Sequence, residues 1–400
     1  MSYTVLARRY RSQSFDDVVG QQPIARTLKN AIATGRVAHA YLFTGTRGVG
    51  KTSMARIFAR ALNAPDTVPD APKPNDGYVY PPLDVQQRMA EAIMRGDDLN
   101  VIEIDGASNR RVEEARNLIA GAGLAPANNA RYKIYIIDEV HMFTTEAFNT
   151  LLKTMEEPPP HVKFILCTTE PHRVLATIQS RCQRFDFRNI PTAEIVKHLQ
   201  NVLAKEKIEA QEQVLWQVGR IANGSMRDAL SLLDRLIATG QSPLTAELLE
   251  QMLGLPPQEL VAQLVDALAA GDIPAALQRT ADLLQRGIAQ DQLIEVLIEH
   301  LRQLMLIAAC GPDSELVELS DEARQAAAQQ AQKFDAAGLV HMIALCENLA
   351  RAGKSGAANP RALLDATIVR LALAEKMADV TALLAGEAAQ KKKFPTRMTA

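Results

Sequence analysis

The sequence has few cysteines and no long apolar run. Its four cysteines, at positions 167, 182, 310 and 346, form no C-x-x-C pair, so neither a zinc site nor a disulfide framework is indicated. No apolar stretch approaches the roughly 18–20 residues of a membrane span, and the first residues lack the apolar core of a signal peptide. We therefore expect a soluble cytoplasmic protein with no zinc and no membrane contact.

A strong excess of charge is also absent. The formal net charge is −2, so total charge gives no indication of a nucleic-acid partner. The first 60 residues differ, because they hold ten Arg or Lys against two acidic residues, a local excess of +8. This excess is compatible with phosphate binding, and a solvated basic face explains it equally well. An apolar content of 47% argues against disorder, and 400 residues allow two or three domains.

The strongest motif is GTRGVGKT at residues 45–52, which fits the phosphate-binding pattern G-x-x-x-x-G-K-[ST]. The apolar run at 40–43 predicts a buried strand before it, and the apolar spacing in 52–63 predicts a helix after it. The loop N–H groups and the helix N-terminus would then face phosphate oxygens. Lys51 would reach the β- and γ-phosphates, and the Thr52 hydroxyl would bind Mg²⁺. The residues expected to bind nucleotide here are Gly45, Thr46, Arg47, Gly48, Val49, Gly50, Lys51 and Thr52.

Strands and helices alternate through the first half of the chain. Further strands are expected at 101–105, 133–139, 163–169 and 185–187, with helices at 23–34, 84–95, 110–120 and 144–157. This alternation predicts an α/β domain with a mostly parallel sheet covered on both faces. Residues 64–82 contain six prolines and should form an irregular surface excursion.

Every segment after Pro191 has a helical pattern. We expect four parts: an α/β P-loop ATPase domain at 1–190, a small helical domain at 191–241, a larger all-α domain at 242–378 and a flexible tail at 379–400. The apolar residues from 293 to 307 cover most of a helix circumference, which indicates a helix buried in its own domain or against a partner chain.

Polar residues follow the other predicted strands. In doubly wound sheets ligands bind at the carboxyl ends of the strands, and Asp138, Glu139, Thr168 and Thr169 all lie at such ends. Asp138 would complete the Mg²⁺ shell, and Glu139 would orient or deprotonate the attacking water. Either threonine is suited to bind the γ-phosphate or that water, although strand preference also explains both.

Two arginines are further candidates. Arg181 follows a predicted helix and is placed either for a local salt bridge or for contact with an adjacent subunit. Arg227 lies at a helix start, where a cation is unfavourable, and this weakly indicates an anionic partner.

With these motifs in place, the chain resembles the gamma/tau family of bacterial DNA polymerase III, the AAA+ ATPases of the sliding-clamp loader. The resemblance is dense over the first 240 residues, whereas the later part matches only in length and helical character. The matching stretches are LARRYRSQSFDDVVGQ (6–21), HAYLFTGTRGVGKTS (39–53), EIDGASN (103–109), IIDEVHM (136–142), LLKTMEEPP (151–159), KFILCTTEP (163–171), SRCQRFDF (180–187) and GSMRDALSLLD (224–234).

The resemblance implies a role for each candidate. Residues 45–52 become the Walker A loop and 138–139 the Walker B pair, and the 191–241 and 242–378 parts become the lid and the oligomerising collar. Thr169 resembles the sensor 1 residue, Arg181 an arginine finger acting on a neighbouring subunit's nucleotide, and Arg227 the sensor 2 residue. The 18–20 stretch, with Val18 and Val19, would line the adenine pocket.

The resemblance also implies partners and shows one departure. It implies a heteropentamer of clamp-loader subunits, the sliding clamp, the polymerase III core and primed DNA bound through phosphates, with Ser108, Asn109 and Arg110 as candidate DNA contacts. The family's usual four zinc-binding cysteines after the P-loop helix are missing, so ATP and Mg²⁺ are expected without zinc. A long form's extra domains would have no room. The alternatives are another AAA+ motor of the branch-migration type and a non-hydrolysing scaffold subunit.

Overall fold

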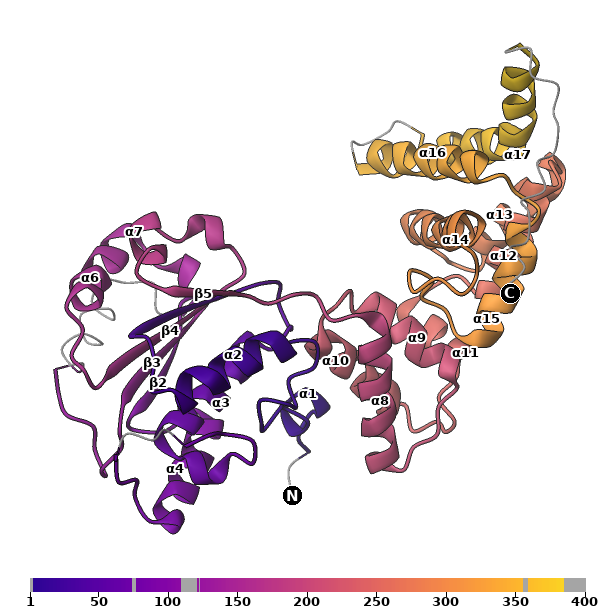
Figure 1. The fold of residues 1–400 in the computed structure, drawn as a ribbon. Coiled ribbons are helices and arrows are strands. Elements are labelled where there is room, and N and C mark those ends of the chain that lie inside the picture. Colours follow the sequence, from indigo (N-terminus) through magenta and orange to yellow (C-terminus); the bar gives the residue numbers. More distant parts are fainter. Residues whose placement is uncertain (1–2, 74–76, 109–120, 122, 355–358, 385–400) are drawn as a thin grey trace, which may run out of the picture. The chain divides into compact units, whose positions relative to one another are not determined.

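The computed structural model describes the chain apart from residues 1–2, 74–76, 109–120, 122, 355–358 and 385–400 (Figure 1). The described chain divides into two compact units. Unit 1 comprises Met1–Lys207 and Val218–Ala238, and unit 2 comprises Ile208–Gln217 and Thr239–Ala400. The helix expected at 110–120 lies outside the described residues.

A parallel sheet forms the centre of unit 1, with its five strands in the order β2-β3-β4-β1-β5. This confirms the predicted parallel α/β fold. The register sets Thr44 opposite Thr168 and Asp105 opposite Asp138, so the carboxyl ends of these strands lie along one edge. The last strand, expected at 185–187, ends at Asp186. Phe187 lies beyond it, although its N–H still donates to the Thr44 carbonyl at 2.7 Å. The strands are β1 Ala40–Thr44, β2 Val101–Asp105, β3 Lys133–Asp138, β4 Val162–Thr168 and β5 Gln183–Asp186.

Helices cover both faces of this sheet because alternate strand residues point to opposite sides. Tyr41 and Phe43 pack in one buried cluster with α2 (Gln22–Ala33) and α3 (Lys51–Asn63), and α4 (Leu83–Arg95) packs on α3. Leu42 packs in a second cluster with α6 (Thr145–Glu156) and the short α7 (Ala176–Gln179). The side chains of β1 are therefore buried on both faces, which holds the loop that follows it in a fixed position.

Unit 1 also contains two helices of the predicted small helical domain, α8 (Thr192–Glu206) and α10 (Met226–Ile237). Helix α9 (Glu212–Ile221) crosses the division between the units. The N-terminal segment, with α1 (Leu6–Arg9), packs on α10. Arg9 forms an ion pair with Glu206 at 2.5 Å, and the Tyr10 hydroxyl donates to the same carboxylate. The N-terminal segment thus joins α8 and α10 to the sheet part of unit 1.

The proline-rich excursion contains only a short 3₁₀ helix among its described residues, η1 (Pro65–Thr67). Asp70 accepts the backbone N–H groups of Phe15 and Asp16 at 3.3 and 2.9 Å. The Gln86 amide donates to Asp66 at 2.8 Å. Hydrogen bonds of Asp66 and Asp70 therefore attach the excursion to the rest of unit 1.

The described residues of unit 2 form helices, joined by connecting segments and by one isolated parallel bridge between Ala210 and Leu244. Helix α14 (Gln290–Cys310) buries Leu293, Leu297, Leu301 and Leu304 in the core of its own unit, where it packs on α16. No helix in the described part of the chain is long and apolar enough to span a membrane. The other helices of the unit are α11 (Ala246–Leu253), α12 (Gln258–Ala269), α13 (Ile273–Gln285), α15 (Asp321–Ala331), α16 (Ala336–Lys354) and α17 (Pro360–Leu384).

This fold predicts which thiols react with an alkylating reagent. Cys310 is exposed and Cys167 is buried, and burial raises the pKa of Cys182 and of Cys346 to about 12. Because the thiolate is the nucleophile, iodoacetamide at about pH 8 should modify the native protein at Cys310 alone. Peptide mass spectrometry measures this, with denatured protein as the control in which all four sites react. Rapid modification of Cys167 or Cys346 in native protein would contradict the described packing.

Candidate nucleotide and magnesium site

The phosphate-binding loop leaves β1 and enters α3, as its motif predicts. Gly48 has a φ of +81, a backbone conformation that residues with a side chain rarely adopt. A Cβ atom there would collide with the Ser225 hydroxyl and would lie 3.3 Å from the Cβ of Arg227. Ser225 is the N-cap of α10, and its hydroxyl accepts the Asp228 N–H at 3.3 Å. Gly48 therefore lets the start of α10 rest directly on the loop.

Lys51 is buried at the first position of α3, with 5% of its surface exposed. Its ammonium group donates to the carbonyls of Gly45 and Thr46 at 2.7 and 2.8 Å. Burial lowers the pKa of Lys51, and the charges around it oppose that shift. A phosphate oxygen is a stronger acceptor than these carbonyls because it carries charge. The ammonium is thus placed to exchange loop carbonyls for phosphate oxygens.

Thr52 and Asp138 join the two motifs. The Thr52 hydroxyl donates to one Asp138 oxygen at 2.7 Å, and the Glu139 N–H donates to the other at 3.0 Å. Burial raises the pKa of Asp138, and the Thr52 hydrogen bond opposes this rise. Two oxygen ligands side by side suit Mg²⁺, which prefers oxygen and keeps several waters or phosphate oxygens in its shell. Among the described residues, no cluster of three His, Cys, Asp or Glu side chains is arranged to hold a metal.

Glu139 occupies a strained turn after β3, with φ +47. Gly106, at the end of β2, makes this turn possible because a Cβ there would lie 2.6 Å from the Glu139 carbonyl. The backbone N–H and the hydroxyl of Thr169 both donate to Oε2 of Glu139, at 3.3 and 3.1 Å. No described residue forms a hydrogen bond with Oε1 of Glu139. One carboxylate oxygen is therefore held while the other is available to a water molecule.

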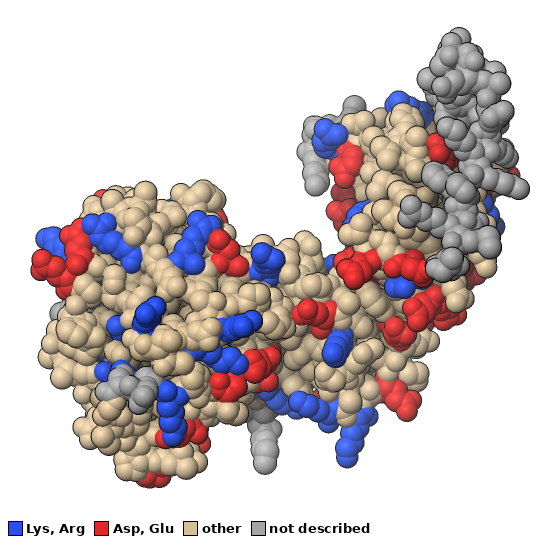
Figure 2. Space-filling model, in the orientation of Figure 1, with Lys and Arg blue, Asp and Glu red and all other residues tan. Residues whose placement is uncertain are grey.

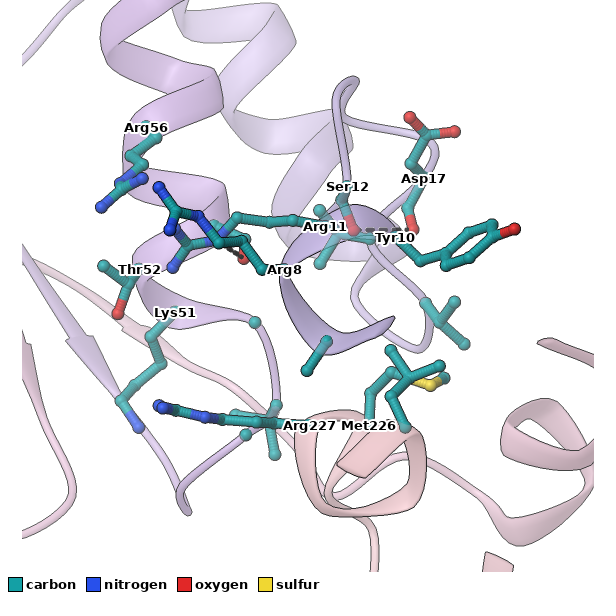
Figure 3. A pocket seen from close by; sticks show the side chains of 18 of the residues that line it. Arg8, Tyr10, Arg11, Ser12, Asp17, Lys51, Thr52, Arg56, Met226 and Arg227 are labelled. Atoms are coloured by element: carbon teal, nitrogen blue, oxygen red, sulfur yellow. Dashed lines mark hydrogen bonds between the residues drawn. The ribbon is translucent and has the colours of Figure 1, made fainter. Parts of the chain in front are cut away.

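A pocket of about 910 Å³ brings these groups together within unit 1 (Figure 3). The predicted residues Val18, Val19 and 47–52 line it, as do Asp138 and Glu139. Arg227 extends from α10 toward Lys51 (Figure 3). Gly45 and Thr46 do not line the pocket, but their carbonyls accept hydrogen bonds from the Lys51 ammonium group.

Arg181 lies away from this pocket. Its guanidinium donates to the Thr177 carbonyl and to a Glu156 carboxylate oxygen, both at 2.7 Å. The side chain is 35% exposed, so it is accessible from outside the chain. The structure thus separates Arg181 from the residues that meet at the loop.

Comparison with known proteins now bears on this site. Residues 20–191 match a family model described as "DNA polymerase III, delta subunit", and residues 194–242 match "DNA polymerase III clamp loader subunit, ATPase lid domain". Residues 244–385 match "DNA polymerase III subunits gamma and tau domain III". A DNA polymerase III subunit gamma of Buchnera aphidicola subsp. Acyrthosiphon pisum is 39% identical over 308 residues, 77% of this chain and 81% of that relative. The chain belongs to the DNA polymerase III gamma/tau family.

Two tau relatives give the same assignment. The Bacillus subtilis subunit is 42% identical over 306 residues, 76% of this chain and 52% of the relative. The Escherichia coli subunit is 39% identical over 323 residues, 80% of this chain and 48% of the relative. The chain therefore spans about half the length of the tau subunits that it matches. The resemblance stated from the motifs is confirmed.

Several pocket residues of this gamma/tau chain were not singled out from the sequence. Arg11 donates to the Ser53 hydroxyl at 3.2 Å, and burial, with Arg56 nearby, lowers the pKa of Arg11. Arg56 is itself held by a bidentate pair with Glu103 at 2.6 and 2.8 Å. The excess of basic residues among the first 60 was the sequence feature that could have indicated Arg11 and Arg56. Gly106 gave none, because its close approach to Glu139 depends on the pairing of β2 with β3.

The contact between Gly48 and Ser225 yields a prediction. Gly48→Ala adds a positive-φ penalty of about 1 kcal/mol and also pushes α10 off the loop. We expect it to weaken binding of a fluorescent ATP analogue at least about tenfold, equivalent to roughly 1.4 kcal/mol. Gly35→Ala is the matched control, since φ is +68 there and nothing lies within 4 Å of the added Cβ.

A second substitution distinguishes a collision of the added Cβ with Ser225 from a direct effect of Gly48→Ala on the loop backbone. Ser225→Gly removes the colliding hydroxyl and should restore part of the binding lost in Gly48→Ala. Equal affinities for Gly48→Ala and Gly35→Ala, or no recovery in the double variant, would contradict the proposed contact.

Proposed function

We propose that the chain is the ATP-hydrolysing subunit of the DNA polymerase III clamp loader, which loads the sliding clamp onto primed DNA during replication. One observation carries the proposal: Lys51, Thr52, Asp138 and Glu139 meet in one pocket at the carboxyl edge of a parallel sheet. Membership of the gamma/tau family and the match to a clamp-loader lid domain support it.

Each group has a distinct part in hydrolysis. Lys51 neutralises charge on the β- and γ-phosphates, and the loop N–H groups bind their oxygens. Thr52 and Asp138 hold Mg²⁺, which when bound offsets phosphate charge. Oε1 of Glu139 orients the attacking water or accepts its proton, while Thr169 keeps Oε2 in place. Arg227 adds a positive charge from α10 beside Lys51 (Figure 3).

Arg181 completes a different site. Arg181 does not line the pocket and is partly exposed, and both features support action on the nucleotide of a neighbouring subunit. An arginine supplied in trans contributes about 10³–10⁵ in rate in other NTPases. Hydrolysis by this chain would then depend on assembly, which gives the loader a way to couple turnover to its partners.

The domain plan and the partners belong to the same proposal. The ATPase domain spans 1–190, the lid 191–241, the collar 242–378 and the tail 379–400, and α17 continues past the last of these boundaries to Leu384. Partners are the other subunits of a heteropentamer, the clamp, the polymerase core and primed DNA, with ATP and Mg²⁺ and no zinc, in the cytoplasm. Figure 2 shows basic side chains in several separate groups on the face in view. Ser108 is an exposed candidate for phosphate contact, whereas Asn109 and Arg110 lie outside the described residues.

Two substitutions test the assignment of the two sites. Lys51→Ala should abolish productive ATP binding. Arg181→Ala in the assembled complex should leave ATP affinity unchanged and lower kcat about 10³-fold or more, since the transition-state charge loses its partner. Arg184→Ala is the matched control, because Arg184 is also a surface arginine paired with an acid, Asp186 at 2.7 Å. Weakened binding without a loss of kcat in Arg181→Ala would refute the trans role.

The loader function is tested by ATP turnover of the complex with sliding clamp and either primed-template or blunt duplex DNA. Stimulation should require both clamp and a primed junction. Equal stimulation by any DNA without the clamp would indicate another AAA+ motor. No turnover under any condition would indicate a scaffold subunit.

A further inference from the structure

A nearly buried histidine stands directly beside the candidate catalytic carboxylate. His141 lies in η2 (Val140–Met142), two residues after Glu139, and is 8% exposed. Its Nδ1 atom is 3.0 Å from the Thr168 hydroxyl and 3.4 Å from Oε2 of Glu139. Its Nε2 atom is 3.2 Å from Oε1 of Glu170. Both ring nitrogens therefore contact groups at the ends of β3 and β4.

The chemistry of these neighbours fixes the orientation of the ring. The carboxylate of Glu170 can only accept, so the Nε2 atom of His141 carries a proton. The Thr168 hydroxyl oxygen already accepts the Glu170 N–H at 3.0 Å, and its own proton is left for Nδ1 to accept. The ring is thus held on one side by Glu170 and on the other by Thr168. Nδ1 therefore has no proton to donate to Glu139, and the ring restrains that carboxylate by contact alone, at 3.4 Å from Oε2.

Glu139 needs such support. Its backbone is in a strained conformation, and among the described residues its carboxylate is hydrogen-bonded only through Oε2, at distances of 3.1 Å or more. A free rotation of the carboxylate would move Oε1 away from the water that it must orient. His141 contacts Oε2 of Glu139 but does not line the pocket. Its ring therefore limits movement of the Glu139 carboxylate away from the pocket.

We propose that His141 is a positioning residue for ATP hydrolysis, which holds the Glu139 carboxylate against Thr169 and is itself fixed by Thr168 and Glu170. This inference rests on the proposed ATPase function. His141 does not itself line the nucleotide pocket, so its role is to set kcat and not to bind ATP.

The test is His141→Leu in the assembled complex, with clamp and primed DNA. Misplacing the water-orienting group should lower kcat about tenfold or more, while the affinity for a non-hydrolysable ATP analogue stays within about twofold. His172→Leu is the matched control, because His172 also approaches Glu170, at 3.7 Å, but its side chain is 75% exposed. Its kcat should equal that of the unchanged chain.

Two further variants separate positioning from a general loss of stability. His141→Asn keeps a polar group near the place of Nδ1 and should recover part of kcat, whereas His141→Leu should not. In a Glu139→Gln background, His141→Leu should cause no additional loss, because its effect passes through Glu139. A purely structural defect would add to the loss in that background and would follow the Tm of each variant.

The outcomes distinguish this inference from the proposed function. If the unchanged complex hydrolyses ATP and His141→Leu keeps its kcat within about twofold, the positioning role is wrong and the ATPase assignment stands. If analogue affinity falls as much as kcat, the positioning role is also wrong. Absence of hydrolysis by the unchanged complex would refute the proposed function itself.

Discussion

The hydrogen bond from Thr52 to Asp138 is the contact on which the candidate site depends. It joins residues 86 positions apart, one at the start of α3 and one at the end of β3. A hydrogen bond to a charged group contributes about 1.5–3 kcal/mol. It forms only because β4 lies between β1 and β3 in parallel register, which sets all three carboxyl ends at one edge. Strand order thus determines whether the two motifs can share one metal ion.

The motifs could be predicted from the sequence because each is local. The strand, loop and helix around 45–52 need no information beyond neighbouring residues, and the parallel sheet follows from alternation. Contacts across strands could not be predicted. The pairing of Thr169 with Glu139, the contacts of the His141 ring with Thr168 and Glu139, and the approach of Gly106 all depend on register. The same holds for Ser225 above Gly48, which depends on how α10 packs on the loop.

The role proposed for Arg181 would give the molecule a second functional surface. Its exposed pair with Glu156 contributes only about 0–1 kcal/mol, so a phosphate of a neighbouring chain can replace it at little cost. Lys51, by contrast, is buried, and its ammonium group donates two hydrogen bonds to loop carbonyls. Under the proposed function, nucleotide binding and the water-orienting group lie within unit 1, and assembly would add the Arg181 of a neighbouring chain.

The most direct measurement of this separation compares the chain alone with the chain assembled with its partner subunits. ATP binding is measured by equilibrium titration and turnover by phosphate release, at the same nucleotide concentration. The account predicts that the chain alone binds ATP with Mg²⁺ and hydrolyses it slowly, and that assembly raises kcat by orders of magnitude. Equal kcat before and after assembly would contradict it.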